Sequence, residues 1–90
     1  MSDNQAQQQM YRTHGTCSRA ITFELDGENK VHNVQFMGGC NGNLKGIGQL
    51  VEGMDAQWVI DRTQGTKCGG RPTSCPDQLS RALRVALEQG

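Results

Sequence analysis

The C-terminal segment carries the pattern that most restricts how this chain can fold. Its apolar residues recur three or four positions apart, which is the spacing of one face of an α-helix. They are Leu79, Ala82, Leu83, Ala86 and Leu87. The polar residues between them, which we expect on the solvent side, are Ser80, Arg81, Arg84 and Glu88. A helix with a single apolar stripe must pack that stripe against another element.

The start of this helix is also marked in the sequence. Pro76 suits the first helical turn because its missing N–H would have no intrahelical partner there. Asp77 complements the positive end of the helix dipole, and we interpret it as a helix-end charge rather than a ligand. Either Ser74 or Cys75 is then the N-cap. Both assignments bring the Cys75 sulfur close to unpaired backbone N–H groups, which favour the thiolate.

A β-hairpin is predicted upstream of the helices. Ile21, Phe23 and Leu25 alternate with polar residues, as in a half-buried strand. A turn is expected at residues 26–29, with Asp-Gly supplying positive φ, and Val31 to Met37 forms the returning strand. A further short strand is expected near Met10 to Thr13.

Two more helices are expected between the hairpin and the C-terminal helix. The first is expected to begin near Asn41, to bury one stripe of apolar side chains and to end at Gly53. The stripe comprises Leu44, Ile47, Leu50 and Val51. Its three glycines, at positions 42, 46 and 48, suggest close approach of the backbone to another element or to a ligand. Asp55 can cap the second, which Gly65 ends. Trp58 in that second helix is either a core residue or an exposed anchor for a partner.

Composition limits the class of protein. The chain has 90 residues, no formal net charge and a mean hydropathy of −0.64, so we expect one small domain with a modest core and no nucleic-acid or membrane partner. Residues 1–9 are polar and Gln-rich and indicate a disordered tail before a domain over residues 10–90. They contain no secretory apolar region, which favours a cytoplasmic protein with reduced thiols.

Four cysteines are the candidate functional residues. Cys17, Cys40, Cys68 and Cys75 are separated by 22, 27 and 6 residues, so no Cys-x-x-Cys pair is present. Their placement favours a shared site: Cys17 opens a strand, Cys40 follows the strand that pairs with it, and the other two flank the loop before the last helix. Metal or cluster ligation, reactive or disulfide-forming thiols, and small buried hydrophobes are the three interpretations. His14 and His32 are interpreted as surface or strand residues, and Arg71 as a solvated side chain or a counter-charge to the thiolates.

Several segments resemble the TSCPD domain, a small bacterial family with relatives at the C-terminus of some cobalamin-dependent ribonucleotide reductases. They are GTCSR, GGCNGNLKGI, LVEG, CGG and TSCPDQL, within about residues 11 to 88. The resemblance implies a standalone member of that family. It also brings in the alternative of a thiol redox accessory related to the reductase domain.

A more distant resemblance is to the U-type iron-sulfur cluster scaffolds. It implies that Cys17, Cys40 and Cys75 correspond to the three scaffold cysteines. Two positions depart from the scaffold pattern: Arg19 replaces an aspartate that assists cluster release, and Ser74 replaces a histidine. Cys68 would supply a fourth ligand, and four thiolates without the carboxylate favour a closed, stable site.

These observations predict an α+β domain, with a two- or three-stranded antiparallel sheet packed with about three helices, resembling the U-type scaffold fold. The predicted function is a metal-binding domain that acts through a protein partner, with zinc or an iron-sulfur cluster on the four cysteines. The alternatives are the thiol redox accessory and an iron-sulfur scaffold or carrier. No Ser-His-Asp arrangement, catalytic carboxylate pair or phosphate-binding motif is present in the sequence, so a self-contained enzyme is not expected.

Overall fold

The computed structural model describes residues 7–13, 15, 18–38, 41–67, 69–70 and 72–89. Within these ranges the chain forms three strands followed by three helices, which confirms the predicted α+β class. The elements are β1 (Gln7–Arg12), β2 (Ser18–Leu25), β3 (Val31–Gly38), α1 (Asn41–Val51), α2 (Ala56–Thr63) and α3 (Cys75–Gln89).

The strands form one antiparallel sheet in the order β1-β2-β3. The turn between β2 and β3 lies where the sequence predicts it, but its positive φ angle is at Asn29 (62°) and not at Gly27. Asp26 shapes the turn instead, because its Oδ1 accepts hydrogen bonds from the backbone N–H groups of Glu28 (2.8 Å) and Lys30 (3.0 Å).

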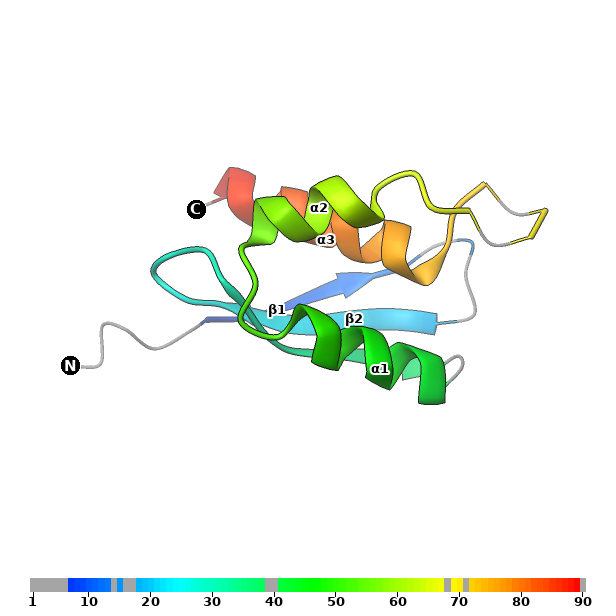
Figure 1. The fold of residues 1–90 in the computed structure, drawn as a ribbon, viewed down its shortest axis with the longest axis horizontal. Coiled ribbons are helices and arrows are strands. Elements are labelled where there is room, and N and C mark those ends of the chain that lie inside the picture. The colour runs from blue at the N-terminus through cyan, green and yellow to red at the C-terminus, as the bar shows by residue number, and fades with distance from the viewer. Residues whose placement is uncertain are drawn as a thin grey trace.

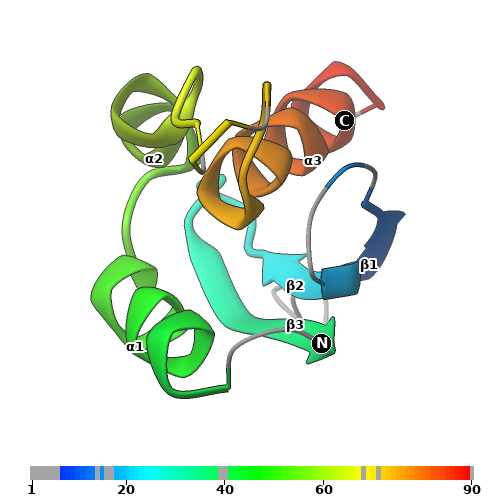
Figure 2. The same ribbon diagram turned by 90° about the vertical axis from the view of Figure 1, so that its right-hand side faces the viewer.

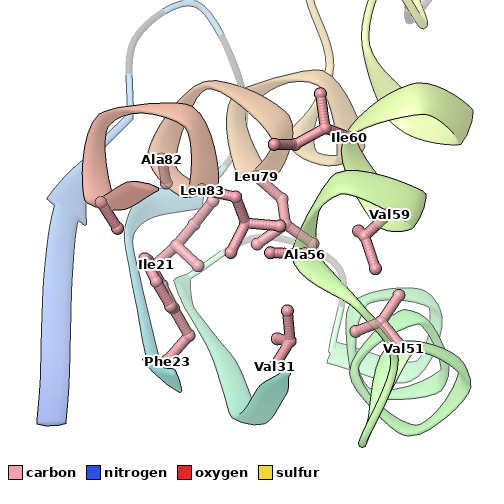
Figure 3. Packing of buried hydrophobic residues seen from close by; sticks show 11 residues of the cluster. Ile21, Phe23, Val31, Val51, Ala56, Val59, Ile60, Leu79, Ala82 and Leu83 are labelled. Atoms are coloured by element: carbon pink, nitrogen blue, oxygen red, sulfur yellow. The ribbon is translucent and has the colours of Figure 1, made fainter. Parts of the chain in front are cut away.

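The helices lie on one face and one edge of the sheet. α2 and α3 form a layer over one face, and α1 lies beside β3 (Figures 1 and 2). The core fills the space between these elements, where sheet side chains meet those of the helices (Figure 3). Its buried members are Ile21, Phe23, Val31, Val51, Ala56, Val59, Ile60, Leu79, Ala82, Leu83 and Ala86.

α1 contacts the sheet along a stripe narrower than the sequence predicts. Leu44 and Val51 are buried, but Leu50 is 78 % exposed, so its assignment to the buried stripe is wrong. The reason is that α1 packs beside a sheet edge rather than across a broad face. Gly48 makes this packing possible: a Cβ there would lie 2.8 Å from the Val34 carbonyl oxygen. A Cβ added at Gly42 or Gly46 would meet nothing within 4 Å, so the close approach is confirmed only at Gly48.

α3 buries more of its circumference than a single stripe. Ser80, predicted on the solvent side, is fully buried, so that prediction is wrong. α3 packs against α2 at its side and against the sheet on another side, and together these two contacts cover a wider arc of the helix (Figure 2). The Ser80 hydroxyl is accommodated by donating to the Asp77 carbonyl at 2.6 Å. Arg81, Arg84 and Glu88 are exposed as predicted.

The predicted helix ends are confirmed for α1 and α2. Gly53 and Gly65 have φ angles of 76° and 81° directly beyond these helices, a conformation that favours glycine.

Near the N-terminus, β1 begins at Gln7, so residues 7–9 pair with β2 instead of belonging to a tail. Residues 1–6 lie outside the described part. None of the described helices is long and apolar enough to cross a membrane.

Candidate functional site

Of the four predicted metal ligands, the structure describes Cys75. Cys17, Cys40 and Cys68 lie outside the described residues, as do His14 and Arg71. The four-cysteine ligand set therefore stays a prediction. Within the described ranges, no group of three or more His, Cys, Asp or Glu side chains is arranged to hold a metal ion.

Cys75 is the first residue of α3, and its side chain is buried. Ser74 is the N-cap, because its Oγ accepts a hydrogen bond from the Asp77 backbone N–H (3.2 Å) and its carbonyl accepts the Gln78 N–H (2.8 Å). This resolves the choice between Ser74 and Cys75. The Cys75 sulfur thus belongs to the first turn of the helix.

The Cys75 sulfur contacts the sheet through Ser18. The Ser18 Oγ lies 3.1 Å from the Cys75 Sγ, and both side chains are buried. Ser18 is the first residue of β2 and pairs with Gly38 at the end of β3. The start of β2, the end of β3 and the start of α3 lie at the same end of the molecule (Figures 1 and 2).

A buried hydrogen-bond network surrounds the start of α3. The Asp77 carboxylate accepts hydrogen bonds from the Thr73 hydroxyl and from the Gly65 backbone N–H (2.7 Å). The Gln78 amide donates to Thr73 Oγ1 (2.9 Å), and the Ser74 hydroxyl donates to the Thr66 carbonyl (2.7 Å). Among the described residues, every buried side-chain nitrogen and oxygen has a hydrogen-bond partner. The network fixes the loop after α2 against the helix that carries Cys75.

The carboxylate of Asp77 has a lowered pKa. Burial alone would raise it, but the hydrogen bonds from Thr73 and Gly65 and the guanidinium of Arg81, 3.3 Å away, outweigh burial and hold the pKa below its ordinary value. Asp77 is therefore ionised, and its carboxylate accepts hydrogen bonds at the start of α3. This agrees with its interpretation as a helix-end charge.

A second titratable cluster lies at the β2–β3 turn. His32 Nε2 is 2.8 Å from Asp26 Oδ2, and its Nδ1 is 2.7 Å from Glu52 Oε2. The hydrogen bonds to Asp26 and then to Glu52 raise the pKa of His32. Those from His32 and the Lys30 backbone lower the pKa of Asp26 to about 2. Sequence patterns identified His32 only as a surface or strand residue, since the members of this cluster come from separate segments.

Two other features of the surface are an aromatic residue and a groove. Trp58 is 37 % exposed, and the Arg62 guanidinium carbon lies 4.0 Å from its ring centroid, so Trp58 is not a fully buried core residue.

A groove of about 410 Å³ between β3 and α1 is lined by Val34, Gln35, Phe36, Leu44 and Lys45. The described residues that line this groove include no carboxylate, histidine or cysteine.

Comparison with known protein families identifies a family for this chain. The model of the TSCPD domain matches residues 2–87, which is nearly the whole chain. No curated protein and no solved structure matches the chain. The family match covers both the strands and the helix that begins at Cys75, and on this basis the chain belongs to the TSCPD domain family.

Proposed function

We propose that this protein is a small cytoplasmic metal-binding domain that acts through a protein partner. Its ligands would be the thiolates of Cys17, Cys40, Cys68 and Cys75, and its metal would be zinc. The observation that carries the proposal is the buried Cys75 sulfur in the first turn of α3, 3.1 Å from Ser18 at the end of the sheet.

The described neighbours of the other cysteines support a shared site. Cys17 directly precedes Ser18, and Cys40 follows Gly38 by two positions, while Ser18 and Gly38 are paired. Thr66, two positions before Cys68, is hydrogen bonded to Ser74, the neighbour of Cys75. Consecutive Cα atoms are about 3.8 Å apart. Each of these three cysteines is therefore separated by only one or two residue lengths from a described residue near Cys75.

The residues at the two positions that differ from the scaffold pattern favour a closed site. Ser74 is engaged as the N-cap of α3 and as a donor to the Thr66 carbonyl. Arg19 is exposed and provides no carboxylate. Four thiolates suit a tetrahedral structural zinc, which is redox-silent. Such a site contributes on the order of 10 kcal/mol of apparent binding free energy at neutral pH, comparable with the stability of a small domain.

The ligand set is tested by replacing each cysteine with serine in the full chain. We expect each of the four single variants to lose most of its bound zinc, measured by mass spectrometry after gel filtration, and to melt at a lower temperature than the wild type. Ser80→Ala is the matched control, because it alters a buried residue of α3 without removing a proposed ligand.

Three outcomes would contradict the proposal. Wild-type metal content and thermal stability in Cys17→Ser and Cys68→Ser would remove these residues from the ligand set. A metal-free wild type in which two cysteines oxidise reversibly to a disulfide would favour the redox accessory. Stoichiometric iron and sulfide with a brown colour would instead favour the cluster scaffold or carrier.

A further inference from the structure

The contact between Ser18 and Cys75 joins two elements that are 57 positions apart in the sequence. The exposed fraction is 4 % for Ser18 and 6 % for Cys75, so the contact is shielded from water. A hydrogen bond in such a site is stronger than one in bulk solvent. The pair therefore links the start of β2 to the first turn of α3.

A break in the strand register directs Ser18 toward α3. Ala20 pairs with Met37 and Ser18 pairs with Gly38, so two steps along β2 match one step along β3. In a regular strand, Ser18 and Ala20 would point to the same face, opposite to the buried Ile21. A bulge of this kind can re-aim a side chain, and here the Ser18 hydroxyl reaches Cys75 on the helix side.

Thr13, the residue that directly follows β1, holds the backbone at Ser18 and Arg19. The Thr13 hydroxyl donates to the Ser18 carbonyl at 2.6 Å, and the Thr13 N–H donates to the Arg19 carbonyl at 3.1 Å. Thr13 is itself buried. These bonds restrict the position from which the Ser18 hydroxyl approaches the sulfur.

We propose that Ser18 is a positioning residue of the metal site, where its hydroxyl donates a hydrogen bond to the metal-bound thiolate of Cys75. This inference rests on the proposed function. A metal-bound cysteine has no S–H proton, so the hydroxyl must be the donor in this pair. The hydrogen bond orients the sulfur and withdraws charge from it. It also holds the sulfur in a fixed orientation toward the metal, which slows release of the metal.

The test uses the full chain loaded with Co²⁺, whose bonds to thiolates give a charge-transfer absorption band. In Ser18→Ala we expect this band to shift to lower energy, because a thiolate without the hydrogen bond donates charge more readily. We also expect release of the metal to a chelator to be about tenfold faster, as is usual when a ligand loses its outer partner. Ser18→Thr, which retains the hydroxyl, should restore both properties.

Controls separate this role from a general loss of stability. Ser80→Ala removes a buried hydroxyl elsewhere in α3 and should leave the band unchanged. Ser18→Gly provides a second variant without the hydroxyl and should behave like Ser18→Ala. A wild-type band and release rate in Ser18→Ala and Ser18→Gly would overturn the role of Ser18 while leaving the metal site intact. Absence of the band in the wild type would overturn the proposed function and this inference together.

Discussion

His32 connects three segments through its two ring nitrogens. Asp26 precedes the β2–β3 turn, His32 lies in β3, and Glu52 directly follows α1. Glu52 Oε1 also accepts the backbone N–H of Asn33 (2.9 Å), a residue with a φ of 54°. Both ring nitrogens can donate to carboxylates only when the imidazole is protonated. The protonated form therefore ties the end of α1 to the hairpin.

This arrangement predicts a pH dependence of stability. The pKa of His32 is raised, so its contribution is complete below the unfolded pKa of about 6.5 and is lost as pH rises through the folded pKa. We expect the melting temperature of the wild type to fall by about 3 °C relative to His32→Gln across this interval, a modest change because exposed ion pairs are weak. Thermal unfolding of both proteins at several pH values measures the difference. Parallel curves would contradict this role of His32.

Asp77 gives a prediction for the buried network. Asp77→Asn leaves one carbonyl oxygen to accept hydrogen bonds from Thr73 and Gly65, so a buried donor loses its partner. We expect the free energy of unfolding to fall by roughly 1 to 3 kcal/mol at neutral pH, measured by urea denaturation. The exposed Asp61→Asn is the control and should change little. Because the folded pKa of Asp77 is lowered, its contribution is present above its unfolded pKa and is lost as pH falls through the folded pKa. Equal stability of the two variants would exclude this role.

At the scale of elements, α1 is positioned by one close backbone contact. Gly48 faces the Val34 carbonyl, whereas Gly46 has open space where a side chain would lie. A helix beside β3 also covers the outer edge of that strand (Figure 2), which is one way in which proteins protect a sheet edge.

The two glycines predict opposite effects of the same substitution. Gly46→Ala should stabilise the protein by about 0.5 to 1 kcal/mol, because alanine restricts the unfolded chain and favours the helix. Gly48→Ala should destabilise it by roughly 1 to 3 kcal/mol, because its Cβ would lie 2.8 Å from a backbone oxygen and displace α1. Chemical denaturation of both variants measures the changes. A stabilised Gly48→Ala would contradict the observed packing.

Sequence periodicity predicted which elements form but not how much of each helix is buried. The stripe of α3 and the alternation in β2 are local patterns, and both are confirmed at Leu79 and Ile21. The assignments of Leu50 and Ser80 are wrong because burial at these positions depends on neighbouring elements. α1 meets a sheet edge and exposes Leu50, while α3 packs against both α2 and the sheet and buries Ser80.

The candidate site was predicted to a smaller extent. The position of Cys75 at a helix start follows from the local sequence SCPD and is confirmed. The Ser18 contact could not be inferred from local sequence, because it depends on the strand register and on a bulge that is 57 positions away from Cys75 in the sequence, though close to it in space. The cluster around His32 could not be inferred either, because Asp26, His32 and Glu52 come from separate segments of the chain.

At the scale of the whole molecule, we predict that metal binding and folding are coupled. The core of this 90-residue chain is small, and the proposed site would join the sheet to α3. Removing the metal from the purified protein with a chelator should lower its melting temperature by more than about 10 °C, given the usual binding energy of structural zinc. Adding zinc back should restore the original value. An unchanged melting temperature after complete metal removal would show that the fold does not depend on metal.

The metal content of the native protein tests the proposed four-cysteine site before any variant is made. The full chain would be purified without air and without a metal-affinity tag, and its metals would be measured by mass spectrometry beside a visible spectrum. We expect about one zinc per chain and no colour, as for a closed four-thiolate site. A metal-free protein with four titratable thiols would contradict the proposed site.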